Sequence, residues 1–292
     1  MSFKKIISIL CITVLATLAL VGCSSGKSPT GEKGKIKIGY VNWAEGVAMT
    51  NLAKVALEDK MGYEVELTLG EPGMIFTSLS DGNVDAFLDT WLPLTHDDYI
   101  KKYEGKIEDL GYNYENARIG LVVPEYSDIN SIEDLNEFKD DLDGEIIGID
   151  AGAGIMRAAT ESIKDYGLDY KLIEGSGPAM TTMLKEAIDK EKDIVVTGWK
   201  PHWKFARWDL KFLDDPKNSF GESENIHTFT RAGFKEDMPE VAEFFENFIL
   251  DDDQLGSLMG KLEEIEDGEE AAREWMKENE DLVNSWIPKE SK

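Results

Sequence analysis

Asp89-Thr90-Trp91-Leu92-Pro93-Leu94-Thr95-His96 follows the apolar run Ala86-Phe87-Leu88 and marks the end of a buried strand. Thr95 followed three residues later by Asp98 has the pattern of a capping box, which predicts that a helix begins at His96. A tryptophan and a histidine therefore stand at the carboxyl end of a strand, where open α/β sheets bind their ligands. The stretch predicts an α/β sheet with a ligand site at this edge.

Strand-like and helix-like segments alternate on both sides of this stretch. Residues 36 to 40 alternate between apolar and polar side chains, and apolar residues recur at helical spacing from 49 to 57. A further strand is predicted from Ile119 to Val123, and Ser131 has the pattern of a helix cap. A second alternation begins with the strand at 146 to 149, and from Pro239 onward the chain is helical, in segments of roughly 239–248, 253–265 and 269–286. Strands separated by helices of this length predict parallel β-α-β units, here in two lobes whose C-terminal helices pack on the first.

The first residues have the pattern of a secretory signal. Lys4 and Lys5 precede the apolar run from Ile6 to Leu20, and Leu-Val-Gly-Cys ends at Cys23. This ending resembles the bacterial lipobox, whose cysteine is lipidated, and acyl chains on Cys23 would hold the protein at a membrane surface. The predicted divisions are a signal peptide at 1–22, a flexible linker at 23–35, a first lobe of 36–122 plus 231–292, and a second lobe of 123–230.

The chain is strongly acidic, with a formal net charge of −27. Such a surface repels phosphate backbones, so we expect no nucleic-acid partner. Adaptation to a saline medium and an ordinary acidic extracellular surface both explain the excess of carboxylates, and the sequence leaves the two explanations open.

Three tryptophans, Trp43, Trp91 and Trp199, each follow a predicted strand. Several indole faces together form a cage for quaternary ammonium, which is charged but has no N–H to donate. A single tryptophan at a strand end more often closes a core, and three at equivalent positions favour the cage. The remaining tryptophans and histidines, apart from His96, are interpreted as core packing, namely Trp203, Trp208, Trp275, Trp286, His202 and His227.

A second feature suits an anion. The turn Gly152-Ala153-Gly154-Ile155 opens a helix, where backbone N–H groups are free to bind a carboxylate. His96 can add a donor, although a single histidine here more often caps a helix or lies at the surface. A cation cage beside a carboxylate seat describes a betaine-like zwitterion.

An enzyme is the competing interpretation, either a surface-tethered hydrolase or a transferase. The sequence has no Gly-x-Ser-x-Gly elbow and no His-Glu-x-x-His motif, and its three histidines lack metal-ligand spacing. We therefore expect no catalytic residue, no metal and no cofactor. A ligand-sensing subunit without transport is a further alternative.

Several separate motifs lie between Lys35 and Trp286, namely Tyr-Val-Asn-Trp at 40–43, Trp-Leu-Pro-Leu-Thr-His at 91–96, Gly-Ala-Gly-Ile-Met at 152–156, Thr-Gly-Trp-Lys-Pro-His-Trp at 197–203 and Ile-His-Thr-Phe-Thr-Arg at 226–231. Together they resemble the glycine betaine/proline betaine substrate-binding lipoproteins of osmoprotectant ABC importers. The resemblance implies an α/β, two-lobed periplasmic-binding-protein fold of type II, the Venus flytrap, with the ligand in the cleft.

The same resemblance implies the site and the partners. The tryptophans that surround the trimethylammonium group match Trp43, Trp91 and Trp199, and the carboxylate is held by residues matching His96, Gly154 and Ile155. Glycine betaine or proline betaine is the implied ligand, and an ABC permease with its ATPase is the implied partner. The protein is then expected to be an extracytoplasmic monomer, lipid-anchored to the cell membrane through Cys23.

Overall fold

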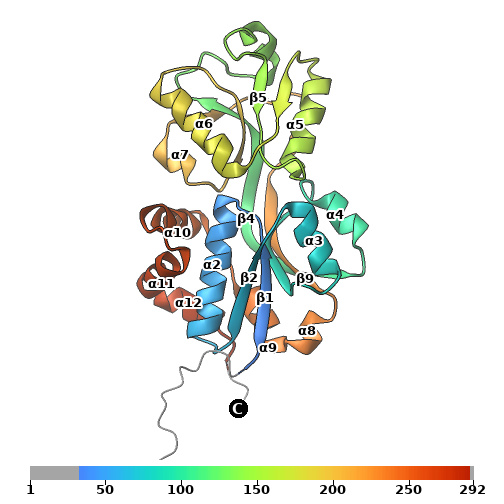
Figure 1. Ribbon diagram of the computed structural model, residues 1–292, viewed down its shortest axis with the longest axis vertical. Helices are drawn as coiled ribbons and strands as arrows, with labels where there is room; N and C mark the ends of the chain where they lie inside the picture. Colours follow the sequence, from blue (N-terminus) through green and yellow to red (C-terminus); the bar gives the residue numbers. More distant parts are fainter. Residues whose placement is uncertain (1–32, 290–292) are drawn as a thin grey trace, which may run out of the picture.

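The computed structural model describes residues 33–289 and consists of two lobes, one above the other in Figure 1. One path of paired strands runs through both lobes in the order β2-β1-β3-β9-β4-β7-β5-β6, and β8 pairs with β4. The strands are β1 (Lys35–Tyr40), β2 (Glu64–Leu69), β3 (Ala86–Leu92), β4 (Ile107–Pro124), β5 (Glu145–Ile147), β6 (Lys171–Ile173), β7 (Val196–Lys200), β8 (Leu210–Phe212) and β9 (Glu224–Arg231).

Helices cover the sheet in both lobes (Figure 1). Those of the first half of the chain and of the second lobe are α2 (Ala44–Asp59), α3 (Pro72–Ser80), α4 (Asp97–Lys102), the 3-10 helix η1 (Ile132–Phe138), α5 (Gly154–Asp165), α6 (Gly177–Asp189) and α7 (Lys204–Arg207). The C-terminal helices are α8 (Phe234–Asp237), α9 (Pro239–Asn247), α10 (Asp252–Glu264), α11 (Gly268–Glu278) and α12 (Glu280–Trp286). Helices α10 and α11 pack on α2, as the prediction for the C-terminal helices requires.

The first lobe is built around β1 and β3. Strand β1 pairs in parallel with both β2 and β3, which confirms the predicted β-α-β units, whereas β9 pairs antiparallel with β3. Ile36, Ile38 and Phe87 on these strands are completely buried. Burial of each such side chain stabilises the fold by about 1.5–3 kcal/mol, so the strand ends that carry the site rest on a well-packed layer.

Strand β4 continues from one lobe into the other. From Ile107 to Ala117 it pairs with β9, and from Arg118 to Val122 it pairs with β7 of the second lobe. The lobe boundaries after residues 122 and 230 stay a prediction. The strand pairing favours a chain that passes into the second lobe near Ala117 and returns to the first lobe before Glu224, because all of β9 is bonded to strands of the first lobe.

Two local predictions are wrong. The helix expected from His96 begins at Asp97, and the capping box does not form because the Thr95 hydroxyl bonds to the Glu224 carboxylate instead. The C-terminal helical segment from residue 269 to 286 is divided into α11 and α12 at Asn279. In contrast, the cap predicted at Ser131 is confirmed, with its side chain in a full capping box.

The predicted signal peptide, the lipidation site Cys23 and most of the linker lie outside the described residues. Strand β1 begins at Lys35, the last residue of the predicted linker. Within residues 33–289, no helix combines the length and hydropathy that a membrane span requires.

Candidate functional site

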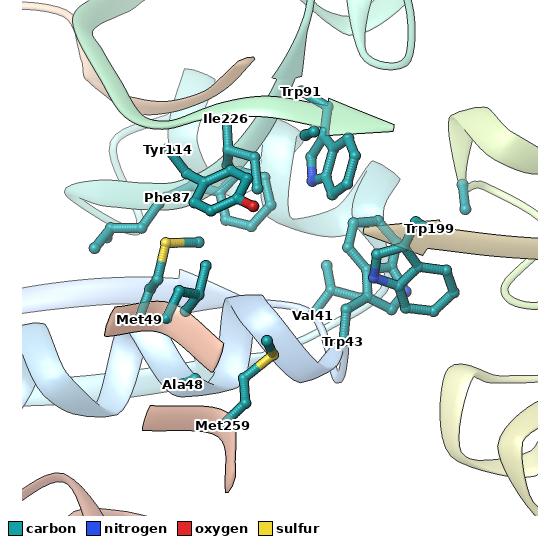
Figure 2. Packing of buried hydrophobic residues seen from close by; sticks show 14 of the residues in the cluster. Val41, Trp43, Ala48, Met49, Phe87, Trp91, Tyr114, Trp199, Ile226 and Met259 are labelled. Atoms are coloured by element: carbon teal, nitrogen blue, oxygen red, sulfur yellow. The ribbon is translucent and has the colours of Figure 1, made fainter. Parts of the chain in front are cut away.

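Three indole rings line one cavity between the lobes. Trp43 precedes helix α2, Trp91 lies in β3 and Trp199 lies in β7. None of the three is more than 5% exposed, and Figure 2 shows their rings at the same end of the buried cluster. The fold thus brings together side chains that are as many as 156 positions apart in the chain.

All six residues predicted to bind ligand line this cavity. They are Trp43, Trp91, His96, Gly154, Ile155 and Trp199, and the other lining residues are Glu45, Thr95, Ile119, Ile149 and Ala153. Their placement agrees with the prediction, and their role in binding stays a prediction.

Two of the indole N–H groups are bonded across the cleft. Trp43 Nε1 donates to Asp150 Oδ2 of the second lobe at 3.0 Å. In the opposite direction, Trp199 Nε1 donates to Glu45 Oε2 of the first lobe at 2.7 Å. Each lobe therefore supplies the acceptor that orients the tryptophan of the other lobe.

The third indole is oriented within its own strand. Trp91 Nε1 donates to Asp89 Oδ1 at 2.7 Å, and the other carboxylate oxygen of Asp89 has no hydrogen-bond partner in the described part of the chain. Every indole N–H is thus directed at a carboxylate, so contacts with a ligand cation would be made by the ring faces. Sequence analysis missed this use of acidic residues, although Glu45 and Asp89 each stand two positions from a cage tryptophan.

The two buried carboxyl groups Glu45 and Asp89 make one side of the site acidic. Burial raises the pKa of Glu45 well above its usual range, and the Asp89 carboxylate raises it further. Burial also raises the pKa of Asp89 to about 7, against the lowering effect of the Trp91 hydrogen bond. Carboxylates in this position lose their hydration and are stabilised by a cation nearby.

His96 is held as a neutral donor. Its Nδ1 accepts the backbone N–H of Trp91 at 2.8 Å, so the proton resides on Nε2, which has no partner among residues 33–289. The ring is completely buried and lies parallel to Trp43, with centroids 5.9 Å apart and planes 7° apart. Burial, and secondarily Arg157, lowers the pKa of His96 to about 3. The site therefore presents an imidazole N–H without a charge.

The amides of Gly154 and Ile155 begin helix α5. No hydrogen-bond acceptor for either amide is found within the described range, as expected for the first turn of a helix. A Cβ atom on Gly154 would lie 1.9 Å from the carbonyl oxygen of Thr95, so only glycine permits this approach of the two lobes. Helix N-termini of this kind stabilise anions.

The segment opposite that helix is fixed by a buried acid. Glu224, at the start of β9, accepts the backbone N–H of Leu94 at 2.7 Å and that of Thr95 at 2.8 Å, and it also bonds the Thr95 hydroxyl. Sequence analysis did not identify Glu224, which lies 129 positions from Thr95.

Further contacts join the lobes around the cavity. Arg157 Nη2 donates to the carbonyl of Leu94 at 2.9 Å, and the Tyr99 hydroxyl donates to the carbonyl of Gly152 at 3.0 Å. Together with the indole bonds they show a closed arrangement of the two lobes. A larger groove beside the cage is lined in part by Trp203 and Trp208, which are half-buried.

The geometry provides an aromatic cage at one end and neutral N–H donors at the other. In the described residues, no group of three or more histidine, cysteine, aspartate or glutamate side chains has an arrangement that could hold a metal ion. The arrangement can bind a small molecule that carries a cation and an anion a few bonds apart.

Comparison with known proteins identifies a family. Residues 34–278 match the substrate-binding domain of the ABC-type glycine betaine transport system. The glycine betaine/carnitine transport binding protein GbuC of Listeria monocytogenes is 49% identical over 144 residues, a match that covers 48% of this chain and 48% of that protein. The chain thus matches about half the length of this curated relative.

Solved structures match over nearly their whole length. Lactococcal OpuAC, in a closed conformation with glycine betaine, has 37% identity and a TM-score of 0.82, covering 87% of this chain and 99% of its own. The glycine/betaine/L-proline-binding protein ProX of Borrelia burgdorferi has 37% identity and a TM-score of 0.83, covering 87% of this chain and 97% of its own. These likenesses confirm the predicted type II periplasmic-binding-protein fold. The chain belongs to the family of substrate-binding domains of ABC-type glycine betaine transport systems.

Proposed function

We propose that this chain is the extracytoplasmic substrate-binding protein of an ABC importer and captures glycine betaine, or a related zwitterion such as proline betaine, between its lobes. The observation that carries the proposal is the convergence of Trp43, Trp91 and Trp199 on one cavity opposite the start of helix α5. Family membership supports the same function.

The cation end of the ligand would contact the indole faces. A quaternary ammonium over an aromatic ring gains about 0.5–2 kcal/mol per contact, more when water is excluded. The three rings are almost completely buried, so each contact would lie toward the upper part of that range. Buried carboxyl groups at Glu45 and Asp89 add favourable electrostatics on the same side.

The carboxylate end would bind the amides of Gly154 and Ile155 and the Nε2–H of His96. All three donors lack a partner among the described residues. Each hydrogen bond to a charged group contributes about 1.5–3 kcal/mol. A ligand without a carboxylate would therefore bind more weakly.

The test is calorimetric titration of the purified protein with glycine betaine. Trp91→Ala should weaken binding by about tenfold to a hundredfold, since it removes one aromatic wall worth about 1.4–2.7 kcal/mol. Trp208→Ala is the matched control, because Trp208 lines the neighbouring groove and not the cage. Unchanged affinity of Trp91→Ala, with the control also unchanged, would reject the site.

The partners and the anchor extend this proposal. An ABC permease and its ATPase would receive the ligand, and acyl chains on Cys23 would tether a monomeric protein to the membrane after removal of residues 1–22. Radiolabelled fatty acid should enter the wild-type protein and not Cys23→Ala. Labelling of both would contradict the anchor.

A hydrolase and a sensing subunit are the competing functions. A hydrolase in the same cleft would turn over choline esters, and we expect no product above background. A sensing subunit would bind betaine without transport, so deletion of the gene should abolish betaine uptake at high osmolarity only if the protein serves an importer.

A further inference from the structure

A lysine is buried directly behind the cage. Lys204 begins helix α7 and is completely inaccessible to solvent. Its Nζ lies 4.0 Å from the centroid of the Trp199 ring and has no hydrogen-bond partner in the described part of the chain. An unpaired buried ammonium is costly, so its position calls for a functional explanation.

The ammonium stands over the Trp199 ring without reaching the ligand cavity. Trp199 lines that cavity, whereas Lys204 is not among its lining residues. The edge of the ring is fixed by the hydrogen bond from Nε1 to Glu45. The indole therefore separates a lysine charge from the ligand cation by little more than one ring.

Other charged and titratable groups surround this lysine. Glu45 faces it from α2, Asp89 is close behind Glu45, and His202 Nδ1 accepts the backbone N–H of Lys204 at 3.1 Å. The neighbouring Lys200 Nζ is exposed and lies over Phe205 at 4.6 Å.

The remaining nearby cation also points elsewhere. Arg207, on the same helix, lies over Trp203 and Trp208 at 5.8 and 5.9 Å. The only cation that stands over a cage indole, among residues 33–289, is the ammonium of Lys204.

We propose that Lys204 is a specificity-determining residue whose charge, placed behind Trp199, disfavours a bare quaternary-ammonium cation in the cage and so selects for zwitterions. The inference rests on the proposed function of the cage. It concerns discrimination between ligands such as choline, which lacks a carboxylate, and glycine betaine, which has one.

The size of the effect follows from Coulomb's law. A ligand cation on the opposite face of Trp199 would stand about 9 Å from Nζ, and at an effective permittivity of about 20 the repulsion weakens binding roughly 20-fold. The carboxylate of a betaine lies only about 3 Å farther away and is attracted, which reduces the net effect to roughly twofold. The lysine thus opposes choline about ten times more strongly than it opposes betaine.

The charge of Lys204 also depends on pH. Burial lowers the pKa of Lys204 to about 7, and the Glu45 carboxylate acts in the opposite direction. The ammonium form therefore predominates at pH 6 and the neutral amine at pH 8.5. His96 and His202 stay neutral throughout this range, because burial lowers both of their pKa values.

The experiment measures the Kd of choline and of glycine betaine for wild type and Lys204→Met at pH 6 and pH 8.5. At pH 6 the variant should bind choline about tenfold or more tighter and betaine about twofold tighter, so the ratio of the two constants falls about tenfold. In the wild type the ratio should fall toward the variant's value at pH 8.5. Glu45 and Asp89 also titrate in this range, and the Lys204 charge lowers the pKa of Glu45, so the ratio at pH 6 decides the inference and the wild-type pH profile supports it.

Lys200→Met is the matched control, since it removes an exposed charge from the same segment, and it should change neither constant. A purely structural role for Lys204 would move both ligands together, and a ratio within twofold of wild type at pH 6 would overturn the inference. If Lys204→Met does not fold, Lys204→Gln and the wild-type pH profile give the same decision. Failure of the wild type to bind betaine would overturn the proposed function, whereas betaine binding with an unchanged ratio overturns only this inference.

Discussion

Replacing Gly154 with alanine should prevent full closure of the lobes without harming either lobe. The added Cβ would stand 1.9 Å from the Thr95 carbonyl oxygen, against a minimum of about 3.0 Å for real contacts, so the lobes must separate by about 1 Å. The Thr95 carbonyl cannot retreat easily, because Glu224 holds the backbone N–H of the same residue at 2.8 Å.

The cost follows from the contacts that such a separation breaks. The Arg157–Leu94 and Tyr99–Gly152 hydrogen bonds, at 2.9 and 3.0 Å, would both lengthen beyond hydrogen-bond range. Two bonds of about 0.5–1.5 kcal/mol each correspond to roughly a tenfold to hundredfold loss of betaine affinity.

The stability of Gly154→Ala should increase while its betaine affinity falls. Gly154 opens helix α5 and does not have a positive φ, so alanine fits its backbone and should raise the free energy of unfolding by up to about 1 kcal/mol. Calorimetric titration gives the affinity, and thermal unfolding without ligand gives the stability. Gly256→Ala is the control, since its Cβ would meet no atom within 4 Å and should leave affinity unchanged. An unaltered Kd for Gly154→Ala would refute the reasoning about closure.

Further outcomes concern three residues, His96, Asp89 and Arg157. Because burial lowers the pKa of His96 to about 3, betaine affinity should show no histidine transition between pH 5 and 8, and a midpoint near 6.5 that His96→Gln abolishes would contradict this. Below about pH 6.5 the unfolded chain takes up a proton on this histidine and the folded chain does not. The free energy of unfolding should therefore fall on acidification by up to about 1.4 kcal/mol per pH unit, and it should fall less steeply in His96→Gln. Asp89 has the opposite effect: burial raises its pKa to about 7, so the free energy of unfolding should fall as the pH rises from about 4 to 7. Asp89→Asn keeps an acceptor for Trp91, and the free energy of unfolding measured by chemical denaturation should then change less with pH over that range. An equal pH dependence in both proteins would contradict the burial of this carboxyl group. Arg157→Ala removes the hydrogen bond to the Leu94 carbonyl and an exposed ion pair with Asp98 that contributes little to stability. Calorimetric titration should show betaine binding about two- to tenfold weaker, with an unchanged unfolding temperature. A larger loss would mean that the exposed ion pair contributes to closure.

The site residues that could be predicted are those that a short segment marks by its own sequence pattern. Trp91 and His96 stand in the same strand-to-turn stretch, and the order of apolar and polar residues there predicts both the strand and its ligand edge. The carboxyl partners of the indoles were not predictable in this way. Trp199 and Glu45 are 154 positions apart, and their bond exists only because two lobes meet.

Irregular pairing hid part of the fold. The first half of β4 was not expected from the sequence, which predicted a strand only from Ile119 to Val123. Its pairing with β9 shifts register between Asp109 and Tyr112, and again before Ala117, so the alternation of buried and exposed residues is interrupted. Lys204 was equally hidden, because a lysine in sequence gives no sign of complete burial.

The reciprocal indole bonds have a kinetic consequence. Asp150 and Glu45 orient Trp43 and Trp199 only when the lobes are shut, so an open molecule meets its ligand with one anchored ring, that of Trp91. The association rate of the ligand then depends on the open form, and its dissociation rate depends on the closed form. Substitutions at Asp150 or Glu45 should therefore quicken ligand escape while leaving the association rate nearly constant.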